Sequence, residues 1–362
     1  MIRIRLGRVL EISATRPGVT EMLVDVDGGT APALNYDDVC GPVAVGDEVV
    51  LNTSAVSLGL GTGGYHLVMA VVREGARDLK GPGHSMKLRY APTQVRVLAV
   101  EEPESPHHDV MRAHTSLVGM PVVVADLHSQ VAAVAVGVKL ADPGCRVAYV
   151  MTDGAALVAS FSRLLCELKA RNLIDCVVTT GQCFGGDLEA ISLPSGLIAA
   201  RWVGEARVGI VAQGPGNLGS ATPFGFSGAA AADALNTAAV LGGRPIAALR
   251  ISFADSRQRH QGVSHHTLTV LGRLTLARCL VAVPALGADE DEVLWRQLEQ
   301  AGVASRHALL RVDGDPVIDA MVSEGFTPTT MGRTLGEEKA FFSAAGAAGL
   351  LAGRLALGFE VP

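Results

Sequence analysis

The second half of the chain repeats one order of segments: a short apolar run, a polar turn, and a stretch with helical spacing. The apolar runs lie at residues 122–125, 147–151, 176–180, 208–212, 246–251 and 280–283, and a seventh is expected at 308–312. Strands that are apolar throughout are buried on both faces, and their alternation with helices is what parallel sheets with crossover connections require. The sequence therefore predicts an α/β domain with a mostly parallel sheet and helices on both faces.

The helices between these runs are expected from apolar spacing and end signals. Residues 155–171 place five apolar side chains on one stripe. Ser227 is expected to cap a helix over 227–241, and Pro194 fits the first turn of another that ends near Gly204. Residues 344–358 are apolar but contain Arg354 and fall short of the about 20 residues that a membrane span needs. This last stretch is expected to be a packed terminal helix, and no membrane association is predicted.

The first 72 residues have an apolar period of two and frequent turn residues, which is typical of a small antiparallel barrel or sandwich. A further strand is expected at 94–100, either closing this domain or crossing to the next. Residues 101–106 are acidic and contain two prolines, as linkers do. We therefore expect a β domain over 1–100, a linker over 101–118 and the α/β domain over 119–362.

Charge and composition limit the classes of partner that the protein is expected to bind. The net charge is −6 and no run of basic residues occurs, which argues against a nucleic-acid partner. The six cysteines show no C-x-x-C spacing and are expected to be reduced, and the first residues lack the apolar segment of a signal peptide, which favours the cytoplasm. A homo-oligomer is expected, and the helices rich in small residues at 229–241 and 344–357 can pack equally well on their own sheet or on another subunit.

Polar residues and glycines follow five of the apolar runs, at 126–129, 152–154, 181–182, 213–217 and 252–256. Ligands of open α/β sheets bind just outside the carboxyl ends of the strands. The sequence therefore places a small-molecule site at this rim.

Asp126 and His128 are two residues apart at a predicted strand end, so in extended backbone both side chains would leave on one face and could ligate a divalent metal. A third ligand must come from elsewhere, and the candidates are Asp255, His260, His265 and His266. The predicted metal set is Asp126, His128 and His265. Without that meeting these residues are expected as acid/base groups, or His265 and His266 as one packed and one solvated side chain.

A glycine-rich turn follows the run at 208–212, and its Gly214, Gly216 and Gly219 match the dinucleotide pattern G-x-G-x-x-G. In that pattern the helix begins at the third glycine, but Pro223 delays it here. Two alternatives remain: anion binding by the turn together with Asn217, or a turn that only allows close packing.

Further candidate ligand-binding residues lie after other runs. Asp153 could hold a ligand or cap a helix, and Gln182 belongs to the next polar cluster. Asp187 follows two glycines and could act as a base or be solvated. Arg257, with Arg250 and Arg259, surrounds Asp255 and forms either an internal ion-pair cluster or a fork for a carboxylate or phosphate.

Several strings resemble a bacterial family known only as a domain of unknown function, number 3866. They are LGLGTGGYHLV (58–68), SPHHD (105–109), GMPVVVADLHS (119–129), VAYVMTDGAAL (147–157), FGGDLEA (184–190), QGPGNLG (213–219) and HQGVSHH (260–266). The resemblance spans nearly the whole chain. It implies no activity, substrate, cofactor or catalytic residue, so the functional hypotheses rest on the residues.

The first hypothesis is a hydrolase or transferase that acts on a small polar, anionic molecule, with Asp126, His128, Asp255, His265 and His266 as catalytic residues. The alternative is a non-catalytic module that binds a metabolite and regulates a partner. A third option, an oxidoreductase with a nucleotide cofactor, depends only on the glycine turn.

Overall fold

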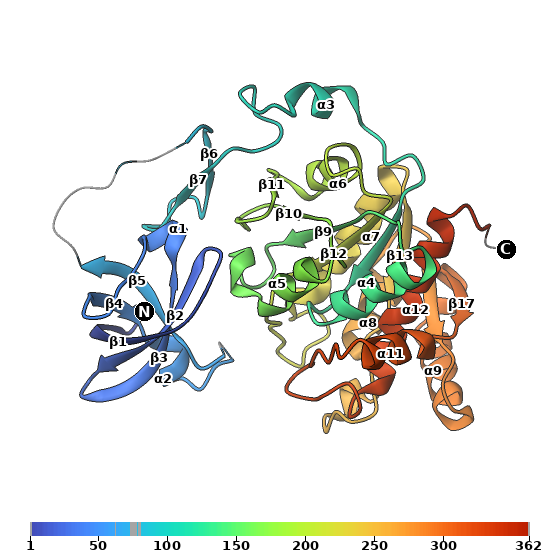
Figure 1. Cartoon of the computed structure of the whole chain (residues 1–362). Coiled ribbons are helices and arrows are strands. Elements are labelled where there is room, and N and C mark those ends of the chain that lie inside the picture. The colour runs from blue at the N-terminus through green and yellow to red at the C-terminus, as the bar shows by residue number, and fades with distance from the viewer. Residues whose placement is uncertain (1, 62, 73–77, 79–80, 361–362) are drawn as a thin grey trace. The chain divides into compact units, whose positions relative to one another are not determined.

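The structure is a computed structural model that describes residues 2–61, 63–72, 78 and 81–360. The chain divides into two compact units, Met1–Val97 and Leu98–Pro362 (Figure 1).

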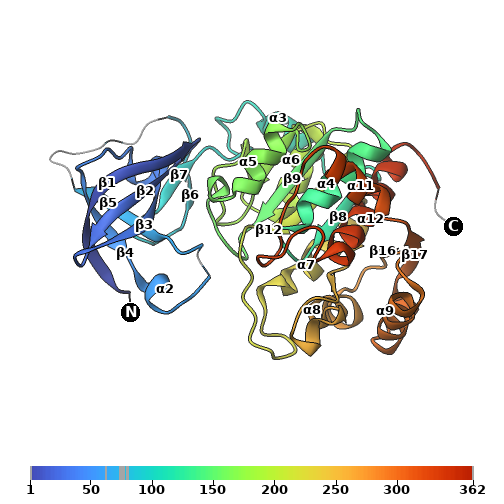
Figure 2. The ribbon, with the colours of Figure 1, turned by 60° about the horizontal axis from the view of Figure 1, so that its bottom comes forward.

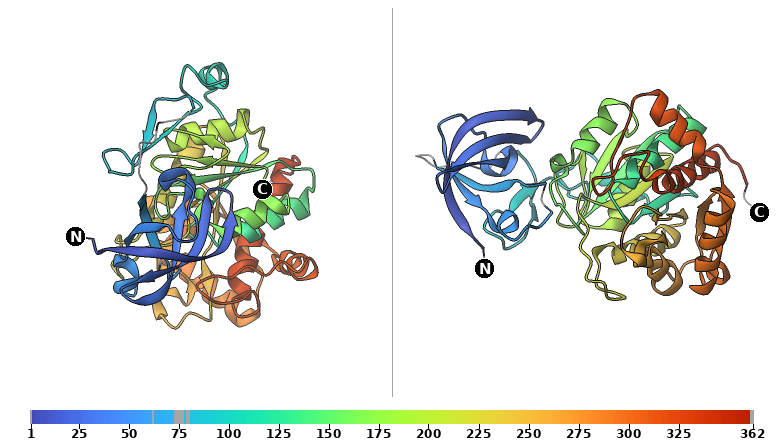
Figure 3. Two further views of the ribbon diagram at one scale, coloured as in Figure 1. Left: turned by 60° about the vertical axis from the view of Figure 1, so that its left-hand side comes forward. Right: turned by 90° about the horizontal axis from the view of Figure 1, so that it is seen from below.

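Within the described part of the first unit, five strands close into a barrel in the order β1-β2-β3-β5-β4 (Figure 3). Its strands are β1 (Ile4–Arg16), β2 (Val19–Val26), β3 (Gly29–Tyr36), β4 (Glu48–Asn52) and β5 (His66–Val72). Neighbours are antiparallel except β3 and β5, an arrangement typical of small Greek-key barrels of the OB type. Alternate side chains, among them Val9, Val24 and Leu51, point inward and form the core. The predicted barrel is confirmed, but such a barrel does not by itself indicate a function.

The strand expected at 94–100 is shorter and lies elsewhere. β7 (Val95–Val97) pairs with β6 (Ser85–Lys87) in a separate two-stranded ribbon and does not close the barrel. The barrel is complete without it, because β1 pairs with both β2 and β4.

In the described residues of the second unit, eight parallel strands form one sheet in the order β11-β10-β9-β12-β8-β13-β16-β17. They are β8 (Pro121–Ala125), β9 (Val147–Thr152), β10 (Cys176–Thr179), β11 (Leu188–Glu189), β12 (Val208–Gln213), β13 (Arg244–Ala248), β16 (Leu280–Pro284) and β17 (Ala308–Val312). The predicted α/β class is confirmed. The two-residue β11 was not predicted, because Leu188 and Glu189 are too short a run to stand out from the loop around them.

Helices cover both faces of this sheet. One face carries α4 (Gln130–Ala141), α5 (Arg163–Ala170), α11 (Asp315–Ser323) and α12 (Lys339–Ala356). The other carries α6 (Leu193–Trp202), α7 (Ala231–Val240), α9 (Ala288–Gln300) and α10 (Val303–Arg306). Figure 2 shows α4, α11 and α12 side by side. Because apolar strands need cover on both faces, this two-sided arrangement explains the continuous apolar runs of the sequence.

The terminal helix α12 packs closely on α4. A side chain at Gly349 would meet the backbone of Val134 at 2.1 Å, and one at Gly137 would meet that of Gly346 at 2.5 Å. The small residues therefore allow two helices of the same chain to approach, which accounts for the predicted packed helix without a second subunit. Within the part of the chain that the structure describes, no helix is both long and apolar enough to span a bilayer.

The helix predicted over 155–171 does not form in the first half of that range. Val158 forms an extended bridge with Phe184, a short 3-10 helix η1 follows at Ala159–Phe161, and α5 begins only at Arg163. Ser162 caps α5 by accepting the Leu165 N–H at 3.0 Å. A helical apolar spacing was present, but pairing with Phe184 holds Val158 in extended backbone.

Residues 101–118, expected to be a linker, contain α3 (His108–Ala113) and bond to the second unit. Glu101 accepts the Ile191 N–H, Leu117 donates to the Leu241 carbonyl, and Trp202 donates to the Ser116 carbonyl. These bonds tie the segment to the helices and loops of the second unit.

Candidate functional site

The centre of the site is the place where the chain leaves neighbouring strands toward opposite faces of the sheet. β8 lies between β12 and β13. The chain continues from β8 into α4 on one face, and from β12 through the 3-10 helix η2 (Ser227–Ala230) into α7 on the other. Such a divergence opens a crevice at the carboxyl ends of the strands, where ligands of open α/β sheets bind.

Asp126 directly follows β8 at this crevice. It is 4% exposed, and the hydroxyl of Thr267 donates to its Oδ2 at 2.5 Å. Burial raises the pKa of this carboxyl to about 6, while the Thr267 hydrogen bond and the nearby Arg250 charge act in the opposite direction. A carboxyl group with such a pKa can exchange a proton near neutral pH.

Arg250 lies two residues after the end of β13 and is 3% exposed. Its Nη1 donates to Nδ1 of His266 at 3.3 Å and its Nη2 contacts the sulfur of Met331 at 3.7 Å. Among the described residues no carboxylate lies within 4.0 Å of this guanidinium. The charges of Asp126 and Asp255 act on Arg250 from beyond that distance, but the guanidinium makes no direct ion pair, so its lost hydration is offset only in part.

Arg250 faces a pocket of about 90 Å³, here called the anion pocket, whose lining is Asn217, Gly219, Ala221, Arg250, Arg257, Arg259, His260, His266 and Met331. No carboxylate belongs to this lining. The Asn217 Oδ1 already accepts hydrogen bonds from Gln213 and Ser227, which leaves the amide NH₂ to donate. Three guanidinium groups and an amide NH₂ thus offer donors, which is the lining that an anionic group requires.

Asp255 holds one of these arginines in place. Arg257 binds both of its oxygens, at 2.9 and 2.6 Å, and Arg333 lies 3.7 Å away. Arg333 is also bonded to Glu338, which accepts from Ser252. The Arg257 hydrogen bonds hold the pKa of Asp255 far below its usual range. A carboxylate that stays ionised cannot donate a proton, and the two hydrogen bonds of Asp255 hold the Arg257 guanidinium at the anion pocket.

Three histidines meet beside the anion pocket, and they are called the histidine cluster below. His260 ends the 3-10 helix η3 (Gln258–His260), while His265 and His266 open α8 (His265–Thr269). Their ring centres lie 5.2, 5.1 and 4.3 Å apart. Ser264 caps α8 by accepting the His266 N–H, and its Oγ lies 2.8 Å from Nδ1 of His260. Phe226 stacks on His266 with ring centres 4.0 Å apart.

The cluster is neutral at ordinary pH. Burial, followed by the Arg250 and Arg257 charges, lowers the pKa of His260 to about 4. Burial and the neighbouring His265 lower the pKa of His266 to about 3. For His265 the pKa is lowered by burial and by Arg259. Neutral imidazoles keep lone pairs and N–H groups available to a ligand.

His128 does not join Asp126. The strand ends at Ala125, so the alternation of side chains that would place residues 126 and 128 on one face no longer applies. The His128 ring lies against Tyr149 (Nδ1, 3.0 Å) and Ser162 (Nε2, 2.7 Å), and burial lowers its pKa to about 4. Since Tyr149 donates to the Ala212 and Gln213 carbonyls, its oxygen accepts from Nδ1, and Ser162 donates to Nε2. Both ring nitrogens are therefore used within the fold.

The metal set of Asp126, His128 and His265 is accordingly not assembled. Among the described residues, the groups of three side chains that could share a metal include neither Asp126 nor His128. One of those groups is the histidine cluster. Its three histidines were named from the sequence, but only as alternative candidates for the third ligand of a different metal site.

Asp153, Gln182 and Asp187 lie on the other side of the sheet centre. Asp153 accepts the backbone N–H of Gln182 and does not cap a helix. Asp187 bonds Lys169 and accepts the Val177 N–H at 2.8 Å. These residues surround the ends of β9 and β10, and β10 is four strands from β13. None of the three belongs to the lining of the anion pocket.

The glycine turn is tight but does not lead into a helix. A side chain at Gly214 would meet the carbonyl oxygen of Ala156 at 2.3 Å, and Gly216 has a φ of +105°. Residues 217–226 then form a loop, and η2 begins only at Ser227. The turn thus brings Asn217 and Gly219 to the anion pocket, and it lacks the helix start that would face a dinucleotide pyrophosphate.

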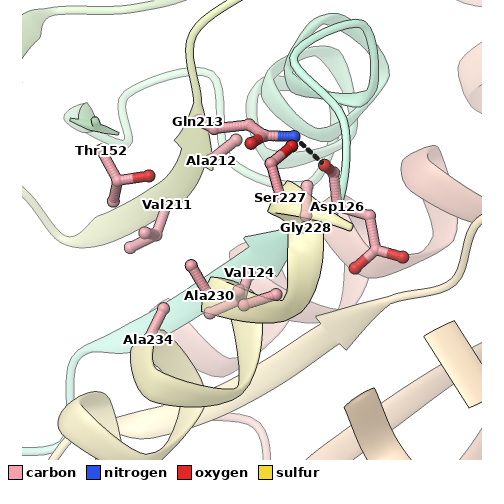
Figure 4. A pocket seen from close by; sticks show the side chains of 12 residues that line it. Val124, Asp126, Thr152, Val211, Ala212, Gln213, Ser227, Gly228, Ala230 and Ala234 are labelled. Atoms are coloured by element: carbon pink, nitrogen blue, oxygen red, sulfur yellow. Dashed lines mark hydrogen bonds between the residues drawn. The ribbon is translucent and has the colours of Figure 1, made fainter. Parts of the chain in front are cut away.

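A small cavity with room for about one water molecule lies between β8, β12 and the start of α7 (Figure 4). Figure 4 shows the Gln213 amide nitrogen bonded to the backbone oxygen of Asp126, while the Asp126 carboxylate points away from Gln213. The Oε1 of Gln213 is buried without a hydrogen-bond partner among the described residues.

Sequence reasoning named Arg250 among the arginines around Asp255 but did not select several other residues of the site. Arg250 carried a signal, because a charged residue inside an apolar run (246–251) must find a partner when it is buried. Thr267, Met331 and Arg333 carried none, because they come from separate segments that meet only in the fold.

A family model described as "Protein of unknown function (DUF3866)" matches residues 32–349. The chain belongs to the DUF3866 family. The resemblance found in the sequence is thereby confirmed for this family. No curated protein matches the chain. The description of the DUF3866 family names no activity, so function has to be argued from the geometry of the site.

Proposed function

We propose that the second unit of this DUF3866 protein is an enzyme, a hydrolase or transferase, that acts on a small molecule bound through an anionic group. The observation that carries this proposal is Arg250, a buried guanidinium that makes no direct ion pair, at the wall of a pocket rich in hydrogen-bond donors. An anion bound there would form that direct pair, since charge-assisted bonds to a guanidinium are among the strongest in proteins.

The residues have distinct parts in this proposal. Arg250, Arg257 and Arg259 bind the anionic group, and the Asn217 amide donates a further hydrogen bond. Asp255 positions Arg257. These fixed positive groups also stabilise negative charge that develops during reaction, which is often the largest contribution to catalysis.

Asp126 is the proposed acid/base group. It is buried, its pKa is raised to about 6, and it lies close enough to Arg250 for the two charges to interact. Hydrolysis and group transfer both need a proton to be taken from a nucleophile or given to a leaving group. His128 has no place in this scheme because both of its ring nitrogens are bonded within the fold.

The first test measures anion binding. The thermal unfolding of the full chain is measured in the presence of inorganic phosphate, sulfate or acetate. The same measurement is then made on the Arg250→Met variant. We expect phosphate to raise the melting temperature of the wild type and to lose at least about tenfold in affinity in Arg250→Met, equivalent to about 1.4 kcal/mol. Arg244→Met, at the exposed amino end of β13, is the control and should bind like the wild type. Equal binding by Arg250→Met and the wild type would contradict the proposal.

The second test separates catalysis from binding alone. A panel of phosphate esters and carboxylate-containing compounds is incubated with wild type and Asp126→Asn, and products are followed by mass spectrometry. Turnover by the wild type that is lost in Asp126→Asn supports the enzyme. Ligands that raise the melting temperature but are never converted would favour the regulatory module instead. The glycine turn gives no support to a nucleotide-dependent oxidoreductase, because no helix begins at its third glycine.

A further inference from the structure

The histidine cluster has the arrangement of a metal site. Each of its three side chains can offer one ring nitrogen such that these atoms lie within 4.8 Å of one another. The ring centres are 4.3–5.2 Å apart. Around a tetrahedral zinc ion with nitrogen ligands at about 2.1 Å, imidazole ring centres lie about 5 Å apart, so rotations of the rings bring the nitrogens to ligand distance.

We propose that His260, His265 and His266 bind one transition-metal ion of the zinc class at the edge of the anion pocket. The inference rests on the proposed function only for the fourth ligand, which is an oxygen of the bound anion or a water molecule.

Free ring nitrogens support this site. Nε2 of His265 is buried and has no hydrogen-bond partner among the described residues. Nδ1 of His260 lies 2.8 Å from Ser264 Oγ, which leaves Nε2 of that ring for a metal. Histidine ligands commonly bond through their second nitrogen to a group that fixes the ring, and Ser264 occupies that position. A buried nitrogen without a partner costs stability, and a metal ion would satisfy it.

The donor set selects the class of metal. Three imidazoles and no thiolate suit zinc and its neighbours in the first transition row, whereas magnesium and calcium prefer oxygen ligands. Three protein ligands leave an open position, as catalytic zinc sites do.

Arg250 links the metal to the anion. Its Nη1 donates to Nδ1 of His266 at 3.3 Å, a long hydrogen bond, and three guanidinium groups nearby repel a bare cation. A bound anion draws Arg250 away from His266 and offsets the positive charge. Metal and anion therefore bind cooperatively, each raising the affinity of the other by the same factor.

The site would supply chemistry that the pocket lacks. A zinc-class ion lowers the pKa of a bound water toward neutrality and polarises an oxygen of the substrate. The residues of this chain then have separate parts: the histidine cluster holds the ion, Arg250 and Arg257 hold the anionic group, and Asp126 takes or gives a proton.

Metal content measures the proposal directly. Bound metal is removed from the full chain with EDTA, and the protein is incubated with zinc chloride or cobalt chloride and desalted. Its metal content is then measured by elemental mass spectrometry. We expect about one ion per chain in the wild type and a visible spectrum of tetrahedral cobalt. His260→Ala and His265→Ala should lower the zinc affinity more than about tenfold. His107→Ala, which removes a histidine at the start of α3, should bind zinc like the wild type.

The same experiment includes a control for folding and a test of cooperative binding of zinc and phosphate. Circular dichroism checks each variant, and His265→Asn serves as a second variant that keeps a polar side chain at the start of α8. Inorganic phosphate should tighten zinc binding to the wild type severalfold and leave it unchanged in Arg250→Met. Wild-type protein that binds no zinc, or folded His260→Ala and His265→Asn variants that retain full affinity, would overturn the site.

The outcome is distinguishable from failure of the proposed function. Phosphate that stabilises the metal-free protein, without any zinc binding, would leave the anion pocket in place and remove the metal. Zinc binding that is lost in the histidine variants, without any effect of phosphate or any turnover, would leave the metal site and remove the proposed enzyme.

Discussion

Two groups of buried histidines in the second unit have the same shift in pKa and different surroundings. His128 and the histidine cluster are all held neutral by burial. The two nitrogens of His128 are bonded to Tyr149 and Ser162, whereas Nε2 of His265 has no partner among the described residues. A lowered pKa therefore marks burial in both places, and the unsatisfied nitrogen distinguishes the place that can receive a ligand.

Removal of a histidine gives the largest expected difference between the two groups. His128→Ala removes the acceptor of the Ser162 hydroxyl proton and opens a cavity, so we expect a loss of about 4 kcal/mol in the free energy of unfolding of the second unit. His265→Ala in metal-free protein should cost less than about 1 kcal/mol, because this side chain is half-buried and its Nε2 has no partner. Urea unfolding measures both values. Equal losses would remove the distinction between the groups.

Lowering the pH is expected to have the second-largest effect, a loss of folding stability that depends on His128. The pKa of His128 is about 4 in the folded state against 6.5 in an unfolded chain, so the unfolded state binds more protons between these values. The stability that depends on neutral His128 is complete above pH 6.5 and is lost as the pH falls toward 4, by as much as about 3 kcal/mol.

His128→Gln isolates this contribution. The difference in unfolding free energy between wild type and variant should shrink by about that amount from pH 7 to pH 4, since the other histidines are common to both proteins. A constant difference over this range would show that His128 does not titrate as its burial requires.

The Asp126→Asn variant tests whether the ionisable carboxyl group in the crevice lowers the stability of the folded protein. The pKa of Asp126 is raised from 3.8 to about 6, so the folded state holds the proton more tightly and stability declines as the pH rises through this window. Asp126→Asn removes this ionisation and should be about 3 kcal/mol more stable than the wild type at pH 7, while losing turnover. Thermal unfolding at pH 4 and pH 7 measures the change. A variant that is less stable at pH 7 and still active would assign Asp126 a structural part.

Two serines give the smallest and most closely matched comparison. Ser162 caps α5 and bonds His128, and Ser264 caps α8 and lies against His260. Loss of either cap should cost about 1 kcal/mol. Only Ser264→Ala should also weaken zinc binding, because Ser264 orients a ligand of the proposed metal. If Ser162→Ala lowers the zinc affinity equally, the two histidine groups are coupled and the comparison fails.

Much of the fold followed from local patterns. Apolar runs separated by helical stretches predicted the α/β sheet, and period-two alternation predicted the barrel. The pattern failed where long-range pairing decided the backbone, as at Val158, and where a strand was too short to be recognised, as in β11. Local spacing reports which face a side chain takes only while the strand continues, which is why the expected pairing of Asp126 with His128 did not form.

The sequence by itself determined that polar groups gather at the carboxyl ends of parallel strands, because burial on both faces dictates apolar strands and polar turns. Tertiary structure alone decided which groups meet. The insertion of β8 between β12 and β13 places Asp126 beside Arg250, and Asp255 is bonded by Arg257 and lies near Arg333. Strand order and side-chain pairing depend on contacts between distant segments, and no local periodicity records them.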